Sequence, residues 1–330
     1  MSESKQSKLA EKFRGALWSD FDDEQNFPTA RPLLAHYSSV AVLEHIVQAE
    51  EVWMSNPLFM NDLEEMRFGM NAGATEFRSN VELAAACGNA TTHARLIRIF
   101  DEYFRAFEER HALDTYVLCL SEHEEGNQDG LLSMWRGYGA NAGGAAIVFD
   151  TSKLQADQNM PFVVARVDYA TGDERLIWIS DKIKAIAQIL ASGDKKEEDL
   201  TAAAWIWLER LKLFAIFTKH PGFKEEREWR IVYYSDRDIG DKFKTMLGYL
   251  ITPRGVEPKL SWSTKSLIVS YIQMTSTIAG SINFASDCRA GLVHLPFHPR
   301  MLQIFWLKSL RRPSSRSVRF SGNLTSPRSM

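Results

Sequence analysis

The sequence predicts an α+β fold in which helices flank a central split or mixed β-sheet. Residues 63–110, 173–190 and 199–218 carry apolar side chains at helical spacing. Short runs rich in β-branched and aromatic residues predict strands at 115–121, 144–149, 162–169, 229–234 and 246–251. These strands do not alternate with helices in the rhythm of a doubly wound parallel sheet. We therefore expect α+β rather than α/β architecture.

Length and composition predict one large domain with polar ends. The chain has 330 residues, of which 45% are hydrophobic, enough to bury a core without disulfides or structural metals. Residues 1–28 read as a polar N-terminal arm, and residues 29–306 as a single α+β domain. Residues 307–330 are rich in Ser and Arg and lack apolar periodicity, so we expect a disordered tail there.

Charge, hydropathy and cysteine content exclude several classes of protein. The net charge of −3 argues against the broad cationic surface that drives nucleic-acid binding. No apolar run approaches the roughly 20 residues of a membrane-spanning helix, and the N-terminus lacks the apolar core of a signal peptide. Cys87, Cys119 and Cys288 lie far apart and outside any zinc-binding spacing. We therefore expect a cytoplasmic protein with reduced thiols, no membrane contact and no metal.

The first candidate motif is His36-Tyr37, at the end of a predicted strand and just before a helix that Ser38 or Ser39 can cap. A single histidine is usually structural. At a strand end beside a tyrosine, however, it can hold a ligand by ring stacking and hydrogen bonding. Both interpretations remain open.

The second motif, Asn61-Asp62, precedes a helical run. We expect these residues to form a turn and cap the helix. The functional alternative is that they line a cleft.

The third motif combines a strand end at Ser121 with a short aromatic helix that carries Trp135, Arg136 and Tyr138. Such a strand end beside such a helix favours a small-molecule cleft. The alternative is that Trp135 and Tyr138 belong to the core and Arg136 is solvated.

The fourth motif is a charged stretch that opens the strand 229–234. At strand spacing, Glu226, Glu228 and Arg230 share one face. The ordinary explanation is a solvated surface. Two neighbouring carboxylates on one face are nevertheless unfavourable unless they are used, and we expect one of them to have a raised pKa. Glu228 is the predicted catalytic residue, ahead of Glu226, because it lies closer to the body of the strand.

Together these motifs resemble the bacterial family called Domain of Unknown Function 2971. The resemblance covers about residues 33–250 in the family's order. It is carried by His36-Tyr37-Ser38, Phe59-x-Asn61-Asp62-x-Glu64, Cys119-x-Ser121, Met134-Trp135-x-x-Tyr138, the strand from Gly143-Gly144 to Phe149, and Phe223-x-x-Glu226-x-Glu228-Trp229-Arg230. Residues 255–330 depart from the family's closing strand, helix and strand.

The family's pattern is in turn similar to the ADP-ribosyltransferase fold, and this similarity implies NAD as a substrate. His36 would hold the ribose and amide, and Tyr37 or an aromatic ring near Trp135 would stack on nicotinamide. Glu226 or Glu228 would stabilise the oxocarbenium-like transition state. The remaining residues implied for NAD binding are Ser121, Arg136, Tyr138 and Arg230.

Two functions from different classes follow. The first is an ADP-ribosyltransferase or NAD glycohydrolase, as a toxin or anti-phage effector, whose macromolecular acceptor would be protein or nucleic acid. The alternative is a non-catalytic ligand- or partner-binding sensor module that works with a partner from a defence operon. In the enzymatic reading, His36, Trp135 and Glu228 converge on one cleft, because binding residues are commonly carried at strand ends and loops of a rigid sheet.

Overall fold

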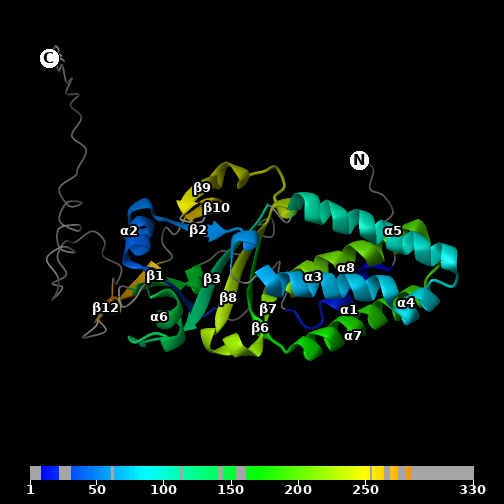
Figure 1. Ribbon diagram of the computed structural model, residues 1–330, viewed down its shortest axis with the longest axis horizontal. Helices are drawn as coiled ribbons and strands as arrows, with labels where there is room; N and C mark the ends of the chain where they lie inside the picture. The colour runs from blue at the N-terminus through cyan, green and yellow to red at the C-terminus, as the bar shows by residue number, and fades with distance from the viewer. Residues whose placement is uncertain are drawn as a thin grey trace, which may run out of the picture. The chain divides into compact units, whose positions relative to one another are not determined.

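The computed structural model describes residues 9–21, 31–60, 63–111, 114–139, 144–153, 161–252, 255–263, 268–273 and 280–283. They lie within one compact unit, Met1–Asn283. In this unit an antiparallel sheet is flanked by helices (Figure 1), which confirms the predicted α+β class. The predictions for the tail at 307–330 and for Asn61-Asp62 fall outside the described residues.

The predicted helical stretches all form helices. Their bounds are α1 (Ala10–Leu17), α2 (Val40–Ala49), α3 (Leu63–Ser79), α4 (Val81–Ala86), α5 (Ala90–Ala106), α6 (Leu132–Tyr138), α7 (Gly172–Ala191) and α8 (Glu197–Phe217). Ser39 caps α2 by accepting a hydrogen bond from the Val42 backbone N–H. None of the described helices combines the length and the apolar character that a membrane-spanning segment needs.

Ten of the described strands form one sheet in which every strand pair is antiparallel. Their bounds are β1 (Leu33–Ser39), β2 (Glu51–Ser55), β3 (Thr115–His123), β4 (Gly144–Asp150), β5 (Phe162–Arg166), β8 (Glu228–Tyr234), β9 (Leu247–Thr252), β10 (Gly255–Ser263), β11 (Ile268–Gln273) and β12 (Gly280–Asn283). The strand order is β12-β11-β4-β1-β3-β2-β10-β9, and β8 pairs with both β3 and β5. The short strands β6 (Asp168–Tyr169) and β7 (Thr218–Lys219) form a separate parallel pair.

The sheet splits along one edge of β3. One edge of this strand pairs with β8 from Thr115 to Ser121. The other edge is shared, because β1 pairs with β3 only over Leu33–Ala35 and β2 pairs with it only at Ser55 opposite Val117. Residues 118–120 therefore lie on this edge between two strands that diverge.

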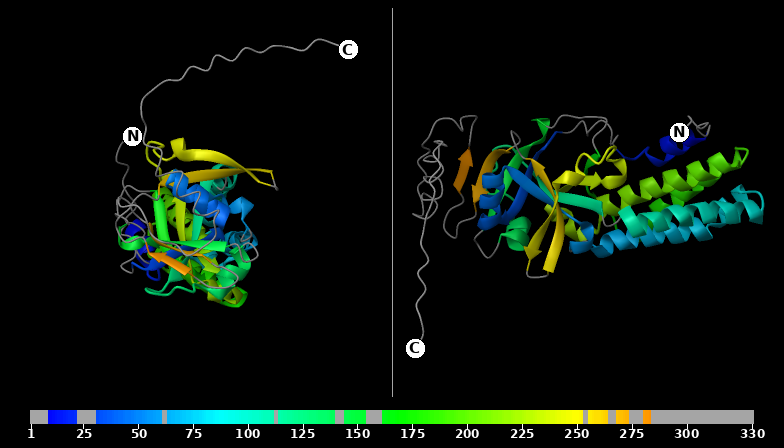
Figure 2. Two further views of the ribbon diagram at one scale, coloured as in Figure 1. Left: turned by 90° about the vertical axis from the view of Figure 1, so that its left-hand side faces the viewer. Right: turned by 90° about the horizontal axis from the view of Figure 1, so that it is seen from above.

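The helices pack around α8, which is buried on nearly all sides, including its charged residues Glu209, Arg210 and Lys212. Helices α3, α5, α7 and α8 run side by side in both Figure 1 and Figure 2. Trp207 of α8 stacks against Phe77 of α3 in the centre of this layer. The C-terminal turns of α8 pack on the sheet through Leu213, Ile216 and Phe217. Because β7 follows α8 directly, this packing fixes the position of Lys219.

Candidate functional site

A cleft of about 230 Å³ opens where β1 and β2 diverge on the edge of β3. Its walls come from β1, β2, β3, α6, β8, β10, the residues Phe59 and Met60, and the segment that leads into β8. Five of the nine predicted site residues line it: His36, Tyr37, Tyr138, Glu226 and Glu228. They come from three separate parts of the chain, and the fold brings them together.

The two glutamates lie on either side of a backbone turn. Glu228 and Arg230 share a face of β8, as their spacing predicts. The prediction is wrong for Glu226, which ends the 3₁₀ helix η5 (Pro221–Glu226) rather than belonging to the strand. Between them Arg227 adopts the left-handed conformation, with φ 46° and ψ 49°. Although this turn redirects the chain, the carboxylates of Glu226 and Glu228 both accept a hydrogen bond from Lys219.

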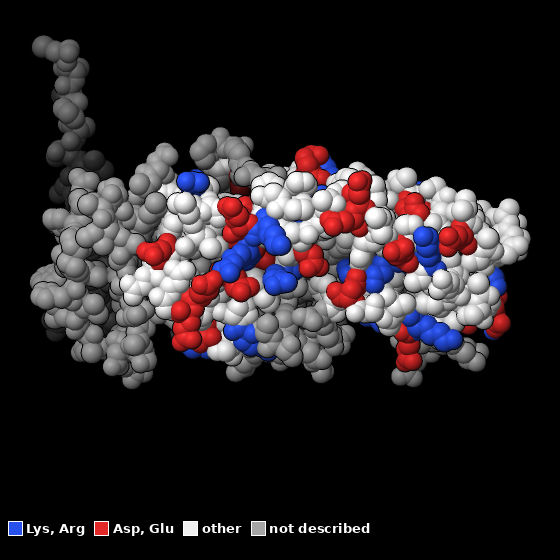
Figure 3. Space-filling view, turned by 90° about the horizontal axis from the view of Figure 1, so that it is seen from below, with Lys and Arg blue, Asp and Glu red and all other residues white. Residues whose placement is uncertain are grey.

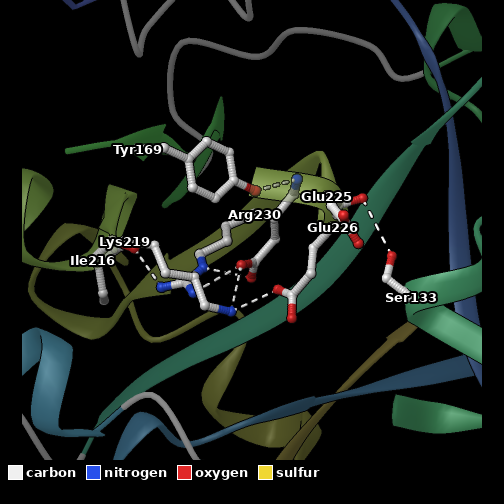
Figure 4. A network of polar contacts seen from close by, with 8 residues as sticks. Ser133, Tyr169, Ile216, Lys219, Glu225, Glu226 and Arg230 are labelled. Carbon is white, nitrogen blue, oxygen red and sulfur yellow. Dashed lines mark hydrogen bonds and ion pairs between the residues drawn. The ribbon is translucent and has the colours of Figure 1, made fainter. Parts of the chain in front are cut away.

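Glu228 is buried, and both of its carboxylate oxygens accept hydrogen bonds. Oε1 accepts from Arg230 Nε at 2.7 Å, and Oε2 accepts from Arg230 Nη2 at 3.1 Å and Lys219 Nζ at 3.2 Å. Arg230 is itself anchored, because its Nη1 donates to the Ile216 carbonyl oxygen at 2.5 Å. Figure 4 shows Lys219 and Arg230 close to Glu226, and Glu228 forms ion pairs with both of these cations.

These contacts decide the ionisation state of Glu228. Burial alone raises the pKa of this carboxyl, but the cations of Arg230 and Lys219, together with hydrogen bonds from Arg230 and the Cys119 thiol, outweigh it and lower the pKa to about 2. Glu228 is therefore ionised at any physiological pH. The predicted raised pKa is wrong for this residue, because the sequence does not show that a lysine from β7 joins the arginine two positions away.

Glu226 has a different environment. Its Oε2 accepts from Lys219 Nζ at 2.7 Å, and its side chain is 17% exposed (Figure 4). Its second oxygen has no hydrogen-bond partner among the described residues. Lys219 also lies 4.5 Å from the centre of the Phe223 ring, which holds the ammonium in place. Glu226 thus keeps one oxygen available to a molecule in the cleft, whereas Glu228 does not.

His36 presents a hydrogen-bond acceptor to the cleft. Its Nδ1 lies 3.3 Å from the carbonyl oxygen of Cys119, on the edge of β3 that the split leaves open. A carbonyl oxygen can only accept, so Nδ1 carries the proton and Nε2 has a lone pair. Burial lowers the pKa of His36, which keeps the imidazole neutral.

Tyr37 is tied to the short aromatic helix. Its hydroxyl accepts a hydrogen bond from the Leu131 backbone N–H at 2.9 Å, and its ring meets the Trp135 ring edge-on at 4.7 Å. Gly130 makes this possible, because a side chain there would meet the Tyr37 hydroxyl at 2.7 Å and its φ is +70°. Trp135 donates its own N–H to the Asp129 carbonyl oxygen at 2.6 Å.

Four predicted site residues do not line the cleft. Trp135 lies behind Tyr37 in a small core, so of the three residues expected to converge only His36 and Glu228 share the cleft. Ser121 is fully buried opposite Glu228 in the β3–β8 register. Arg136 is exposed on α6, and Arg230 contacts Glu228 from behind.

Sequence reasoning missed several residues of the cleft wall, namely Trp53, Ser55, Phe59 and Lys259. It also missed Lys219, which lies behind the wall and pairs with Glu226 and Glu228. Lys219 adjoins the charged motif and could have been suspected as the partner of its two glutamates. Lys259 could not, because only the pairing of β10 with β2 brings it to the site. No group of three or more His, Cys, Asp or Glu side chains suited to a metal ion occurs among the described residues.

The face of the protein seen in Figure 3 carries lysines and arginines interspersed with aspartates and glutamates. No extended field of one sign covers it. This agrees with the low net charge of the chain.

The fold and the site define a class: an α+β protein whose antiparallel sheet opens at a cleft with an ionised, cation-bound glutamate in its wall. Comparison with known families adds one match. The model of the family described as "Protein of unknown function (DUF2971)" matches residues 134–231, which confirms the predicted resemblance over this segment. The matched segment contains Tyr138, Glu226 and Glu228, whereas His36 and Lys259 lie outside it. No curated protein and no solved structure matches the chain.

Proposed function

We propose that the cleft binds NAD and cleaves the bond between nicotinamide and ribose, as an NAD glycohydrolase or an ADP-ribosyltransferase. The observation that carries this proposal is the pair of carboxylates, Glu226 and Glu228, held in the cleft wall by Lys219. A neutral imidazole and a partly exposed tyrosine, Tyr138, line the same cleft.

The reaction needs a negative charge beside the ribose. When the C1′–N1 bond breaks, its electron pair neutralises the pyridinium nitrogen, and positive charge develops on the ribose. A new bond then forms from C1′ to the oxygen of water or of an acceptor, which gives up its proton. A fixed carboxylate stabilises the transition state because its charge acts most strongly when the positive charge has developed.

The environments of the two glutamates suggest a division of roles. Glu226 is assigned the contact with the ribose, because one of its oxygens is unengaged among the described residues. Glu228 is assigned the positioning of Lys219, since its own oxygens are occupied. This assignment reverses the order that strand position alone predicts. The Nε2 of His36 would accept a hydrogen bond from the carboxamide or a ribose hydroxyl, and Tyr138 would stack on the nicotinamide ring.

The protein would act in the cytoplasm, where free thiols such as Cys87 and Cys119 persist. It would act as a toxin or an anti-phage effector, with a protein or nucleic-acid acceptor and an operon partner.

A second function, a non-catalytic sensor of a small ligand, is favoured by one observation. The saturated hydrogen bonding and low pKa of Glu228 also suit a rigid wall that binds without reacting. In that case the cleft would hold its ligand unchanged.

The test is the release of nicotinamide from NAD, measured by chromatography with the purified protein, with and without protein and nucleic-acid acceptors. We expect Glu226→Gln to lower the rate by on the order of 10²-fold or more, with a much smaller change in NAD affinity. The matched control is Glu225→Gln, because Glu225 is exposed and lies outside the cleft wall. Binding of NAD without release under any condition would contradict the enzymatic proposal and favour the sensor. A full rate in Glu226→Gln would contradict the assignment of this residue.

A further inference from the structure

A second polar group of residues lines the same cleft from strands β2 and β10. Lys259 and Ser55 lie directly opposite each other in the β10–β2 register, so their side chains share one face of the sheet. Lys259 Nζ donates to Ser55 Oγ at 2.9 Å, and both residues line the cleft. Lys259 is only 8% exposed.

This pair has hydrogen-bond donors to spare. An ammonium group has three N–H donors. Two are directed at Ser55 and at Glu257 Oε2, which lies 3.1 Å away, and no third partner occurs among the described residues. Ser55 Oγ accepts from the lysine, and its own hydrogen likewise has no acceptor among the described residues. Two donors at one place in a cleft can bind oxygen atoms of a single ligand group.

Charge in this part of the molecule is balanced. Glu257 is 2% exposed and neutralises Lys259, and the Thr252 hydroxyl donates to its other oxygen at 2.9 Å. The nearby cations and carboxylates are equal in number: Lys219, Arg230 and Lys259 against Glu226, Glu228 and Glu257. An anion would therefore be recognised by directed hydrogen bonds rather than by a net positive field.

We propose that Lys259 and Ser55 form an oxyanion subsite that binds a phosphate group of the substrate. A phosphate presents several acceptor oxygens around one centre, which suits an ammonium and a hydroxyl side by side. The inference rests on the proposed function and makes it more specific: the substrate is a phosphorylated nucleoside, such as NAD, rather than a free nucleoside.

The experiment compares two ligands that share the nicotinamide–ribose end, NAD and nicotinamide riboside, which has no phosphate. Their affinities are measured by calorimetry for the unmodified protein, Lys259→Met and Ser55→Ala. We expect Lys259→Met to weaken NAD binding by about tenfold or more and Ser55→Ala by severalfold, while nicotinamide riboside changes by less than about twofold. Lys244→Met is the matched control, because Lys244 is an exposed lysine paired with Asp241 outside the cleft wall.

Inorganic phosphate or diphosphate should compete with NAD in the unmodified protein and should not do so in Lys259→Met. Equal losses for both ligands, or no loss, would overturn the subsite, as would the absence of any binding by NAD and by diphosphate. If Lys259→Met does not fold, as judged by its thermal unfolding, Ser55→Ala and Lys259→Arg decide the question.

The subsite and the proposed function can fail separately. Binding of NAD that depends on Lys259 but releases no nicotinamide would leave the subsite standing and contradict the enzymatic proposal. If Lys259→Met releases nicotinamide with an unchanged KM for NAD, the subsite is contradicted and the enzymatic proposal stands.

Discussion

At the scale of single residues, the buried charges around Glu228 have a direct consequence for acid stability. The pKa of Glu228 is lowered to about 2 by Arg230 and Lys219, against the usual value of about 4.3 for a glutamate in an unfolded chain. A carboxyl group with a lowered pKa stabilises the folded state above its unfolded pKa. This contribution is lost as the pH falls from about 4.3 toward 2.

We therefore predict that the free energy of unfolding falls more steeply with acidification in the unmodified protein than in Glu228→Gln. The contribution of Glu228 at neutral pH is on the order of 3 kcal/mol, at 1.36 kcal/mol for each unit of pKa. Glu228→Gln should also be less stable at pH 7, because it leaves two buried cations without this carboxylate. Urea unfolding at a series of pH values between 7 and 3 measures both effects. Parallel curves for the two proteins would show that the charge of Glu228 is not stabilising.

The residues of the site could be predicted from the sequence to different degrees. His36, Glu226 and Glu228 could be proposed because their motifs lie beside predicted strands, although each motif also has an ordinary structural explanation. Trp135 was predicted to line the binding site because an aromatic ring suits a binding site and a core equally well. In the structure its ring packs against Tyr37 in a small core. Lys259 gave no local signal, since its role depends on a strand pairing about 200 residues away in sequence.

At the scale of elements, the junction of η5 and β8 shows how a local conformation sets the site. Arg227 holds a left-handed conformation that few residues other than glycine adopt readily. The Glu122 backbone N–H donates to its carbonyl oxygen at 2.9 Å, and Arg227 Nη1 donates to Glu124 Oε1 at 2.6 Å. These contacts with the end of β3 stabilise a strained residue, as is common beside functional sites. The strand spacing predicted for Glu226 fails here, because periodicity alone does not reveal a residue with positive φ.

Helix packing makes a second prediction possible at this scale. Gly73 of α3 faces α8 so closely that a side chain there would come within 2.2 Å of Leu211 Cδ1 and 2.8 Å of Cδ2. Leu211 is fully buried and has little room to move. We expect Gly73→Ala to destabilise the protein by about 1–3 kcal/mol, although alanine is the better helix former.

The matched control is Gly15→Ala in α1, where a side chain would meet nothing within 4 Å. There the greater helix propensity of alanine should stabilise by up to about 1 kcal/mol. Thermal unfolding of the two variants measures the difference. A rise in melting temperature for Gly73→Ala would contradict the close approach of α3 to α8.

At the scale of the whole molecule, the α+β class could be predicted because the long helical stretches and the short strands have different periods. The topology could not, since the antiparallel order places β8 beside β3 and β5 through contacts far apart in sequence. The sheet splits because β1 and β2 pair with different parts of the same edge of β3. The cleft therefore depends on the topology, because the residues that line it lie between positions 36 and 259 of the sequence.

The distribution of charge over the molecule makes a final prediction about ligand binding. The net charge is −3, and opposite charges are interspersed on the surface in Figure 3 and balanced around the cleft. A protein that binds nucleic acid through 6–10 phosphates loses about 10³–10⁵ in affinity between 50 and 200 mM salt, because counterions are released. Here recognition would rest on a few directed hydrogen bonds, so we expect the affinity for NAD to change by less than about tenfold over that range. Calorimetry at the two salt concentrations measures this. A change of 10³-fold would mean that the ligand meets a cationic surface outside the cleft, and a long nucleic acid would then be the better candidate for the acceptor.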